Sequence, residues 1–163
     1  GGFVADHGPS SACLTACERG SRGEYITSEG NEIVPTSEFF VFVINAEGEY
    51  SPASISMSKS QSKKARQWNA MMQGLTIPVQ DRRVPAAAFW TAYQLTTVPQ
   101  ENDQGAWFGW SIKMLHDANS GGIIQQHPAG KEIYLAARAF MQQVKDGEVQ
   151  VKQEESEVNS EDF

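Results

Sequence analysis

The chain has 163 residues, of which 40% are hydrophobic, and a formal net charge of −7. This length and composition predict one globular domain with a buried core. No apolar run approaches the roughly 20 residues of a membrane-spanning helix, and no signal-peptide pattern opens the chain, so a membrane is not an expected partner. The net charge by itself argues against nucleic acid as a partner.

The charge is unevenly distributed, however. The last eleven residues hold five of the twenty acids, and they end in an aromatic residue: Glu154, Glu155, Glu157, Glu161, Asp162 and Phe163. We interpret residues 148–163 as a disordered acidic tail, because this composition cannot build a core. Between residues 50 and 100 the sign reverses, and Asp81 is the one acid among six basic residues: Lys59, Lys63, Lys64, Arg66, Arg82 and Arg83. Phosphate binding depends on such local groups rather than on net charge.

Residues 1–37 are rich in Gly, Ser, Thr and Glu. We predict a mostly irregular segment, with short strands near 24–27 and 32–34, that could also supply the first strand of the following domain. Cys13 and Cys17 are spaced C-x3-C, and His7 is the one histidine nearby. A zinc site needs four ligands, so we interpret both cysteines as thiols of a reducing cytoplasm and expect no metal.

The middle of the chain predicts a hairpin followed by a helix. Residues 38–45 read EFFVFVIN and predict a strand, a turn follows at 46–49, and residues 50–57 predict the returning strand. Pro52 lacks a backbone donor, so its strand should lie at an edge or a bulge. Residues 59–73 predict a helix with Ser58 as N-cap and Gly74 at its end. The helix has an apolar side with Trp68 and a basic side with Lys63.

A second hairpin and helix follow. Residues 75–85 predict a loop or broken strand, 86–98 a long strand, 106–116 its partner, and 131–145 a helix. In this register Phe89, Tyr93 and Leu95 share one face, and Trp90 shares the other with Gln94. On the partner strand Trp110 alternates with Trp107, and Trp107 shares its face with Ser111 and Lys113. The order predicts a mainly β fold with two helices, an OB-like five-stranded barrel over residues 38–147. An α+β sandwich is the alternative.

No catalytic motif is present, neither a phosphate-binding glycine loop nor a nucleophile elbow nor a zinc-protease helix. We therefore predict that the protein is not an enzyme and needs no cofactor.

The aromatic load of the second hairpin is high. Such side chains form a core, or they stack on unpaired bases where basic residues are near. The candidate DNA-binding residues are these cations and aromatics: Lys59, Lys63, Lys64, Arg66, Trp68, Arg82, Arg83, Trp90, Tyr93, Trp107, Trp110 and Lys113.

The acidic ending with a terminal Phe163 resembles the C-terminal tails of single-stranded-DNA-binding proteins of bacterial and T7-like phage type. The stretches YSPASISMSKSQSKKARQWNAMM and TAYQLTTVPQENDQGAWFGWSI resemble phage-encoded accessory proteins. The resemblance implies a protein of the host cytoplasm that coats unwound DNA in replication, recombination or repair. It also implies a tail that competes for the basic groove and recruits replication or recombination partners.

Two other functions stay open at this point. An exposed aromatic hairpin also fits a phage structural or assembly protein, in which it forms a subunit interface and the protein is a homo-oligomer. An acidic surface also fits an adaptor that mimics DNA.

Overall fold

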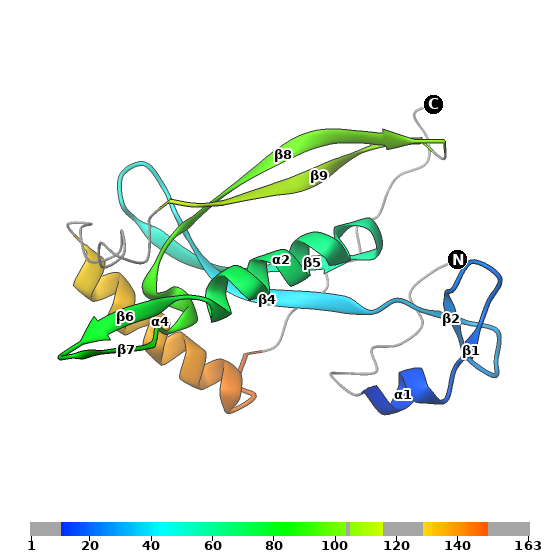
Figure 1. The fold of residues 1–163 in the computed structure, drawn as a ribbon, viewed down its shortest axis with the longest axis horizontal. Coiled ribbons are helices and arrows are strands. Elements are labelled where there is room, and N and C mark those ends of the chain that lie inside the picture. Colours follow the sequence, from blue (N-terminus) through cyan, green and yellow to red (C-terminus); the bar gives the residue numbers. More distant parts are fainter. Residues whose placement is uncertain (1–10, 104, 116–128, 150–163) are drawn as a thin grey trace.

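The computed structural model describes residues 11–103, 105–115 and 129–149. The described part is mainly β, as predicted, with four separate antiparallel sheets and a few helices (Figure 1). The elements are α1 (Ser11–Thr15), β1 (Glu18–Arg19), β2 (Tyr25–Ile26), β3 (Glu32–Ile33), β4 (Thr36–Ile44), β5 (Tyr50–Ser58), η1 (Lys59–Gln61), α2 (Ser62–Gln73), β6 (Thr76–Val79), β7 (Arg82–Pro85), η2 (Ala88–Trp90), β8 (Tyr93–Asn102), β9 (Gly105–Met114) and α4 (Gly130–Lys145).

The predicted OB-like barrel is not found in the described part of the chain. Strands β4 and β5 pair with each other, as do β6 with β7 and β8 with β9, and no strand of one hairpin pairs with another hairpin among these residues. The order of elements matched a barrel, but a barrel also needs hydrogen bonds between hairpins. What joins the hairpins here is side-chain packing through α2.

The core lies where α2 meets the two long hairpins. Phe39 of β4 and Met57 of β5 are buried together with Ala65 and Trp68 of α2. The Trp68 ring stacks on Phe39 with centroids 4.4 Å apart, and it meets Tyr93 of β8 edge-on at 5.8 Å. The apolar side predicted for the helix therefore packs against both hairpins, while its basic side stays at the surface.

Helix α4 covers the other face of β4. Phe140 stacks on Phe42 with centroids 5.2 Å apart and meets Phe40 edge-on at 6.3 Å. Successive strand residues point to opposite faces, so β4 sends Phe39 to α2 and Phe40 to α4. The run EFFVFVIN is apolar on both faces because a helix packs on each.

The structure confirms one prediction of local structure in the hairpins and corrects another. Pro52 lies in β5, an edge strand whose one partner in the described chain is β4, so that prediction is confirmed. The predicted strand 86–98 is wrong over residues 86–92, where the chain forms η2 and packs Phe89 and Trp90 on Tyr134 of α4.

The predicted loop at 75–85 is a short hairpin, with Gln80 at φ 52° in its turn. Pro78 and Pro85 obscured it, yet a two-stranded hairpin tolerates proline because each strand keeps an open edge.

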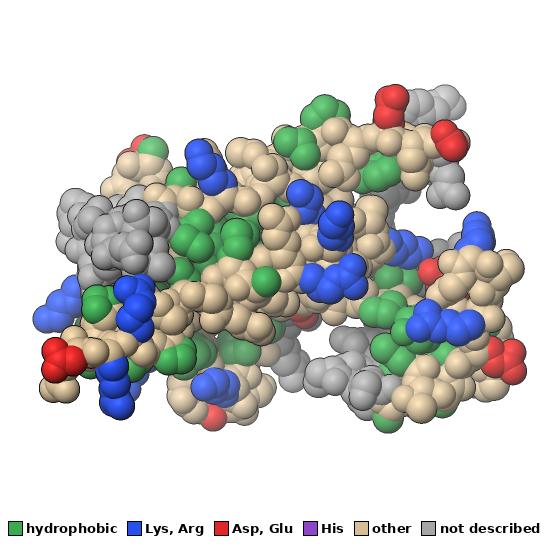
Figure 2. Space-filling view, in the orientation of Figure 1, with side chains coloured by type: hydrophobic (Ala, Val, Ile, Leu, Met, Phe, Trp, Pro, Cys, Tyr) green, Lys and Arg blue, Asp and Glu red, His purple; other side chains and the backbone are tan. Residues whose placement is uncertain are grey.

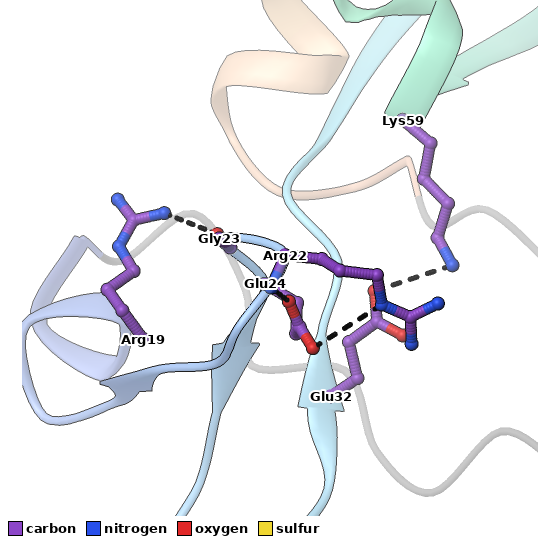
Figure 3. A network of polar contacts seen from close by, with 6 residues as sticks. All are labelled: Arg19, Arg22, Gly23, Glu24, Glu32 and Lys59. Carbon is purple, nitrogen blue, oxygen red and sulfur yellow. Dashed lines mark hydrogen bonds and ion pairs between the residues drawn. The ribbon is translucent and has the colours of Figure 1, made fainter.

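The N-terminal region forms a small three-stranded sheet beside the end of β4 (Figure 1). Strands β2 and β3 coincide with the two short strands predicted there, while α1 and β1 were not predicted. In this lobe Arg19 lies 3.6 Å over the Tyr25 ring and donates to the Gly23 carbonyl at 2.7 Å. Figure 3 shows Lys59, at the start of η1, reaching to Glu32 on β3, with Nζ and Oε1 3.4 Å apart.

Candidate nucleic-acid interface

Four predicted cations lie together on η1 and α2, and we call them the basic helix surface: Lys59, Lys63, Lys64 and Arg66. Lys59 alone has an acidic partner, Glu32, among the described residues. Figure 2 shows Lys and Arg side chains gathered over α2, while most Asp and Glu side chains in this view lie toward the ends of the molecule. This part of the surface therefore attracts anions.

The position of these cations is unfavourable for the helix itself. The first turn of α2 contains Lys63 and Lys64 and no acid, although a helix N-terminus favours negative charge. Each misplaced cation costs about 0.3–1 kcal/mol at an exposed site. Lys59 also has a positive φ of 46°, a conformation that is unfavourable for a residue with a side chain. Helix stability does not explain these residues, whereas an anionic ligand would.

The basic helix surface runs directly into the second long hairpin. The backbone N–H of Trp110, on the edge of β9, donates to Gln61 Oε1 of η1 at 3.1 Å. This bond satisfies a donor on the strand edge and holds the start of α2 against β9. A ligand on α2 can therefore continue over the β9 edge onto the hairpin.

The register of β8 and β9 defines an outer hairpin face, the side of the hairpin that does not pack on α2. No acid lies on this face, and its residues are Gln94, Thr96, Val98, Gln100, Trp107, Gly109, Ser111 and Lys113. The pairing confirms the predicted grouping of Trp107 with Gln94, Ser111 and Lys113, but Trp90, predicted with them, lies in η2 instead. The face offers a half-buried aromatic ring among polar side chains.

Trp107 is held in place on this face. Its Nε1–H donates to Gln100 Oε1 at 2.9 Å, across the pair of strands. Gln100 crosses over Gly109, where an added Cβ would lie 2.5 Å from Gln100 Cδ. Only glycine leaves room for this arrangement, so Gly109 and Gln100 together orient the indole. Sequence reasoning missed both residues, although a glycine in the interior of an aromatic strand signals such a close approach.

The inner face of the same hairpin packs against the core, together with Trp68 of α2. Trp68 is only 4% exposed, and Trp110 and Tyr93 pack against the same cluster. Burial raises the pKa of Tyr93 to about 12, and its hydroxyl has no hydrogen-bond partner in the described structure. Trp68 is enclosed between α2 and Phe39, so its predicted stacking on a base is wrong for this structure. Tyr93 and Trp110 are half-buried against the same cluster, and their stacking stays a prediction.

The remaining predicted residues are not brought to this surface. Trp90 lies in η2 and meets Tyr134 of α4 edge-on at 5.6 Å. Arg82 and Arg83 lie on β7, in a separate hairpin beyond the C-terminal end of α2 (Figure 1). Arg83 donates to Thr76 Oγ1 at 2.8 Å and to its carbonyl at 2.9 Å, which turns it back onto its own hairpin.

The acidic tail and His7 lie outside the described residues, whereas Cys13 and Cys17 lie within them. The tail residues Glu154, Glu155, Glu157, Glu161, Asp162 and Phe163 are outside, as is His7. Cys17 Sγ donates to the Cys13 carbonyl at 3.1 Å. In the described ranges no group of three or more His, Cys, Asp or Glu side chains could hold a metal ion, and no helix is long and apolar enough to cross a membrane.

The described residues thus define a mainly β protein with a surface of cations on η1 and α2 and one oriented tryptophan on an acid-free hairpin face. A family model described as Pam3 phage gp34-like protein matches residues 1–150, and the chain belongs to this family. The match supports the phage origin expected from the sequence. No curated protein and no solved structure matches the chain.

Proposed function

We propose that the protein binds single-stranded DNA without base-sequence preference. The observation that carries this proposal is that Gln61, within the segment of the basic helix surface, contacts the edge of β9, whose outer hairpin face carries the oriented Trp107 and no acid. Single-strand binders combine these two elements, a positive track for the backbone and an aromatic platform for bases.

Each part of the surface has a distinct role in this proposal. Lys63, Lys64 and Arg66 neutralise phosphates, and Lys59 joins them at the expense of its contact with Glu32. Trp107 stacks on one base, an interaction worth about 1–3 kcal/mol. The strand must be single because a paired base does not offer its face to a side chain. Lys113 contacts the backbone where the strand leaves the outer hairpin face.

The protein's role in the phage follows from such binding. It coats unwound strands during replication, recombination or repair and carries out no chemistry of its own. The acidic tail competes with DNA for the cations, and Phe163 engages a replication or recombination partner. Removal of residues 153–163 should therefore tighten DNA binding and abolish recruitment of that partner.

Titration of an oligo-dT by tryptophan fluorescence at several salt concentrations tests the proposal. Five phosphate contacts on a single strand predict that affinity falls about 130-fold between roughly 50 and 200 mM salt. Lys63→Ala and Arg66→Ala should each weaken binding and lower the slope of log affinity against log salt by about 0.7. Trp107→Ala should weaken binding by about 5- to 150-fold and leave that slope unchanged.

Lys145→Ala is the matched control, because it removes the same charge from the far end of α4. It should leave affinity and slope as they are in the parent chain. The proposal is refuted if the chain lacking residues 153–163 does not bind oligo-dT at low salt. It is also refuted if Lys145→Ala weakens binding as much as Arg66→Ala does.

A further inference from the structure

The far end of the β8–β9 hairpin has an exposed face that the DNA-binding proposal does not use. Phe108 is 73% exposed and pairs with Pro99 across the two strands. Both residues lie on the inner face of the hairpin, which packs on α2 at the other end of the hairpin. Glu101 lies two residues nearer the turn than Pro99 and therefore on the same face. Asp103 follows in the turn itself. We call these four residues the arm tip: Pro99, Glu101, Asp103 and Phe108.

The arm tip is unsuited to nucleic acid. Its two acids repel phosphate, and the sequence has no Lys or Arg between residues 83 and 113 to offset them. Its apolar part instead favours a protein surface, since full burial of a phenylalanine side chain is worth about 1.5–3 kcal/mol. The partner of this tip should therefore be apolar and basic.

Helix α4 of the same protein carries such a surface, which we call the α4 patch. Leu135 is 52% exposed, and the cations Lys131 and Arg138 lie one helical turn to either side of it. Neither cation has an acidic partner among the described residues. The nearby acid, Glu132, accepts a hydrogen bond from the Tyr50 hydroxyl at 3.2 Å and is directed to β5. The α4 patch is thus complementary to the arm tip in charge and in character.

We propose that the protein associates with itself head to tail, with the arm tip of one copy bound to the α4 patch of the next. Within one copy the two surfaces belong to different ends of the molecule (Figure 1), so they cannot meet. Pairing of two arm tips is disfavoured because it would place acids opposite acids. A contact between two different patches leaves one of each unused and forms open chains or rings.

This contact is small, so we expect it to be weak between free molecules. Copies held side by side on one strand would strengthen it through their high effective concentration. The inference does not depend on DNA binding, because it concerns surfaces outside the candidate interface. It can therefore fail while the proposed function stands, and the reverse also holds.

Sedimentation velocity of the full chain without nucleic acid tests the contact over a range of protein concentrations. At low salt the average mass should rise with concentration, and high salt should reverse the rise. Two charge-reversed chains separate this contact from others: Glu101→Lys with Asp103→Lys, and Lys131→Glu with Arg138→Glu. Each should associate more than about tenfold more weakly than the parent chain, because like charges then meet at every contact.

An equal mixture of the two reversed chains should associate again, because each arm tip then finds an α4 patch of opposite sign. This restoration also shows that both variants are folded. Phe108→Ser should abolish association. The control variant carries Arg82→Glu and Val79→Ser, which change a similar exposed pair of residues on β6–β7, and it should associate as the parent chain does. The proposal is overturned if the parent chain stays monomeric at low salt, if the mixture stays monomeric, or if the β6–β7 variant abolishes association.

Discussion

The orientation of Trp107 depends on Gly109, which leaves room for the Gln100 side chain that holds the indole. In Gly109→Ala the new Cβ would lie 2.5 Å from Gln100 Cδ and 2.6 Å from its Oε1. The end of a glutamine side chain can move away at little cost, so the fold should survive. Movement of Gln100 breaks its hydrogen bond with Trp107, which leaves the indole free to rotate.

The size of the effect follows from that one bond. A typical hydrogen bond contributes about 0.5–1.5 kcal/mol, so Gly109→Ala should weaken oligo-dT binding by about two- to tenfold. Replacement of a strand glycine by alanine also reduces the entropy of the unfolded chain, by roughly 0.4–1 kcal/mol, so thermal stability should change little. Affinity and stability are thus expected to change independently.

A double-mutant cycle on binding shows whether Gly109 acts through Gln100. In a Gln100→Ala background there is no side chain to displace, so Gly109→Ala should have no further effect on affinity. Equal losses in both backgrounds would refute the reasoning, because the glycine would then act by some other route. No loss from Gly109→Ala in the parent chain would refute the role assigned to the hydrogen bond.

Three other variants probe the core and the start of the helix. Trp68→Ala should lower the free energy of unfolding by about 3–5 kcal/mol in urea titrations, a loss expected of a core ring and not of an exposed one. Burial raises the pKa of native Tyr93 to about 12, whereas the pKa of a tyrosine in the unfolded chain is about 10. Between these two values the native phenol keeps its proton and the unfolded one loses it, so stability should fall as pH rises from about 10 toward 12. Tyr93→Phe should lessen that fall, and an unchanged pH profile of melting temperatures would contradict the assignment. Lys59→Gly relieves the backbone at φ 46° but loses the Glu32 contact, so it should leave stability nearly unchanged while weakening oligo-dT binding. A loss of stability above about 1 kcal/mol would show that the ion pair matters more than the strain.

Much of the local structure was predictable because it is encoded by near neighbours. The aromatic and branched residues of EFFVFVIN predicted β4, and Ser58 and Gly74 bracketed η1 and α2. Residues 86–92 were wrongly predicted as strand because no turn residue separates Phe89 and Trp90 from the strand that follows. What turns that segment into η2 is the packing of Phe89 and Trp90 on Tyr134, more than 40 residues away along the chain.

The candidate site was predictable in its charges and only partly in its aromatics. Cations such as Lys63 and Arg66 remain at the surface in almost any fold, because burial of an unpaired charge is costly. Tryptophan is stable both inside and at an interface, so composition did not separate Trp107 on the outer hairpin face from the tryptophan that forms the core. The predicted barrel failed for a similar reason, since the sequence contains hairpins but does not state which strand edges meet.

The sequence alone determined the two long hairpins, the amphipathic helix and the basic stretch, because each depends on residues within a few positions of one another. It also assigned Trp107 and Trp110 to opposite faces of one hairpin, since strand residues alternate. Only the tertiary structure decided which face is covered. Helix α2 packs on the side of Trp110 and Tyr93, and this leaves Trp107, held by Gln100 over Gly109, on the outer hairpin face.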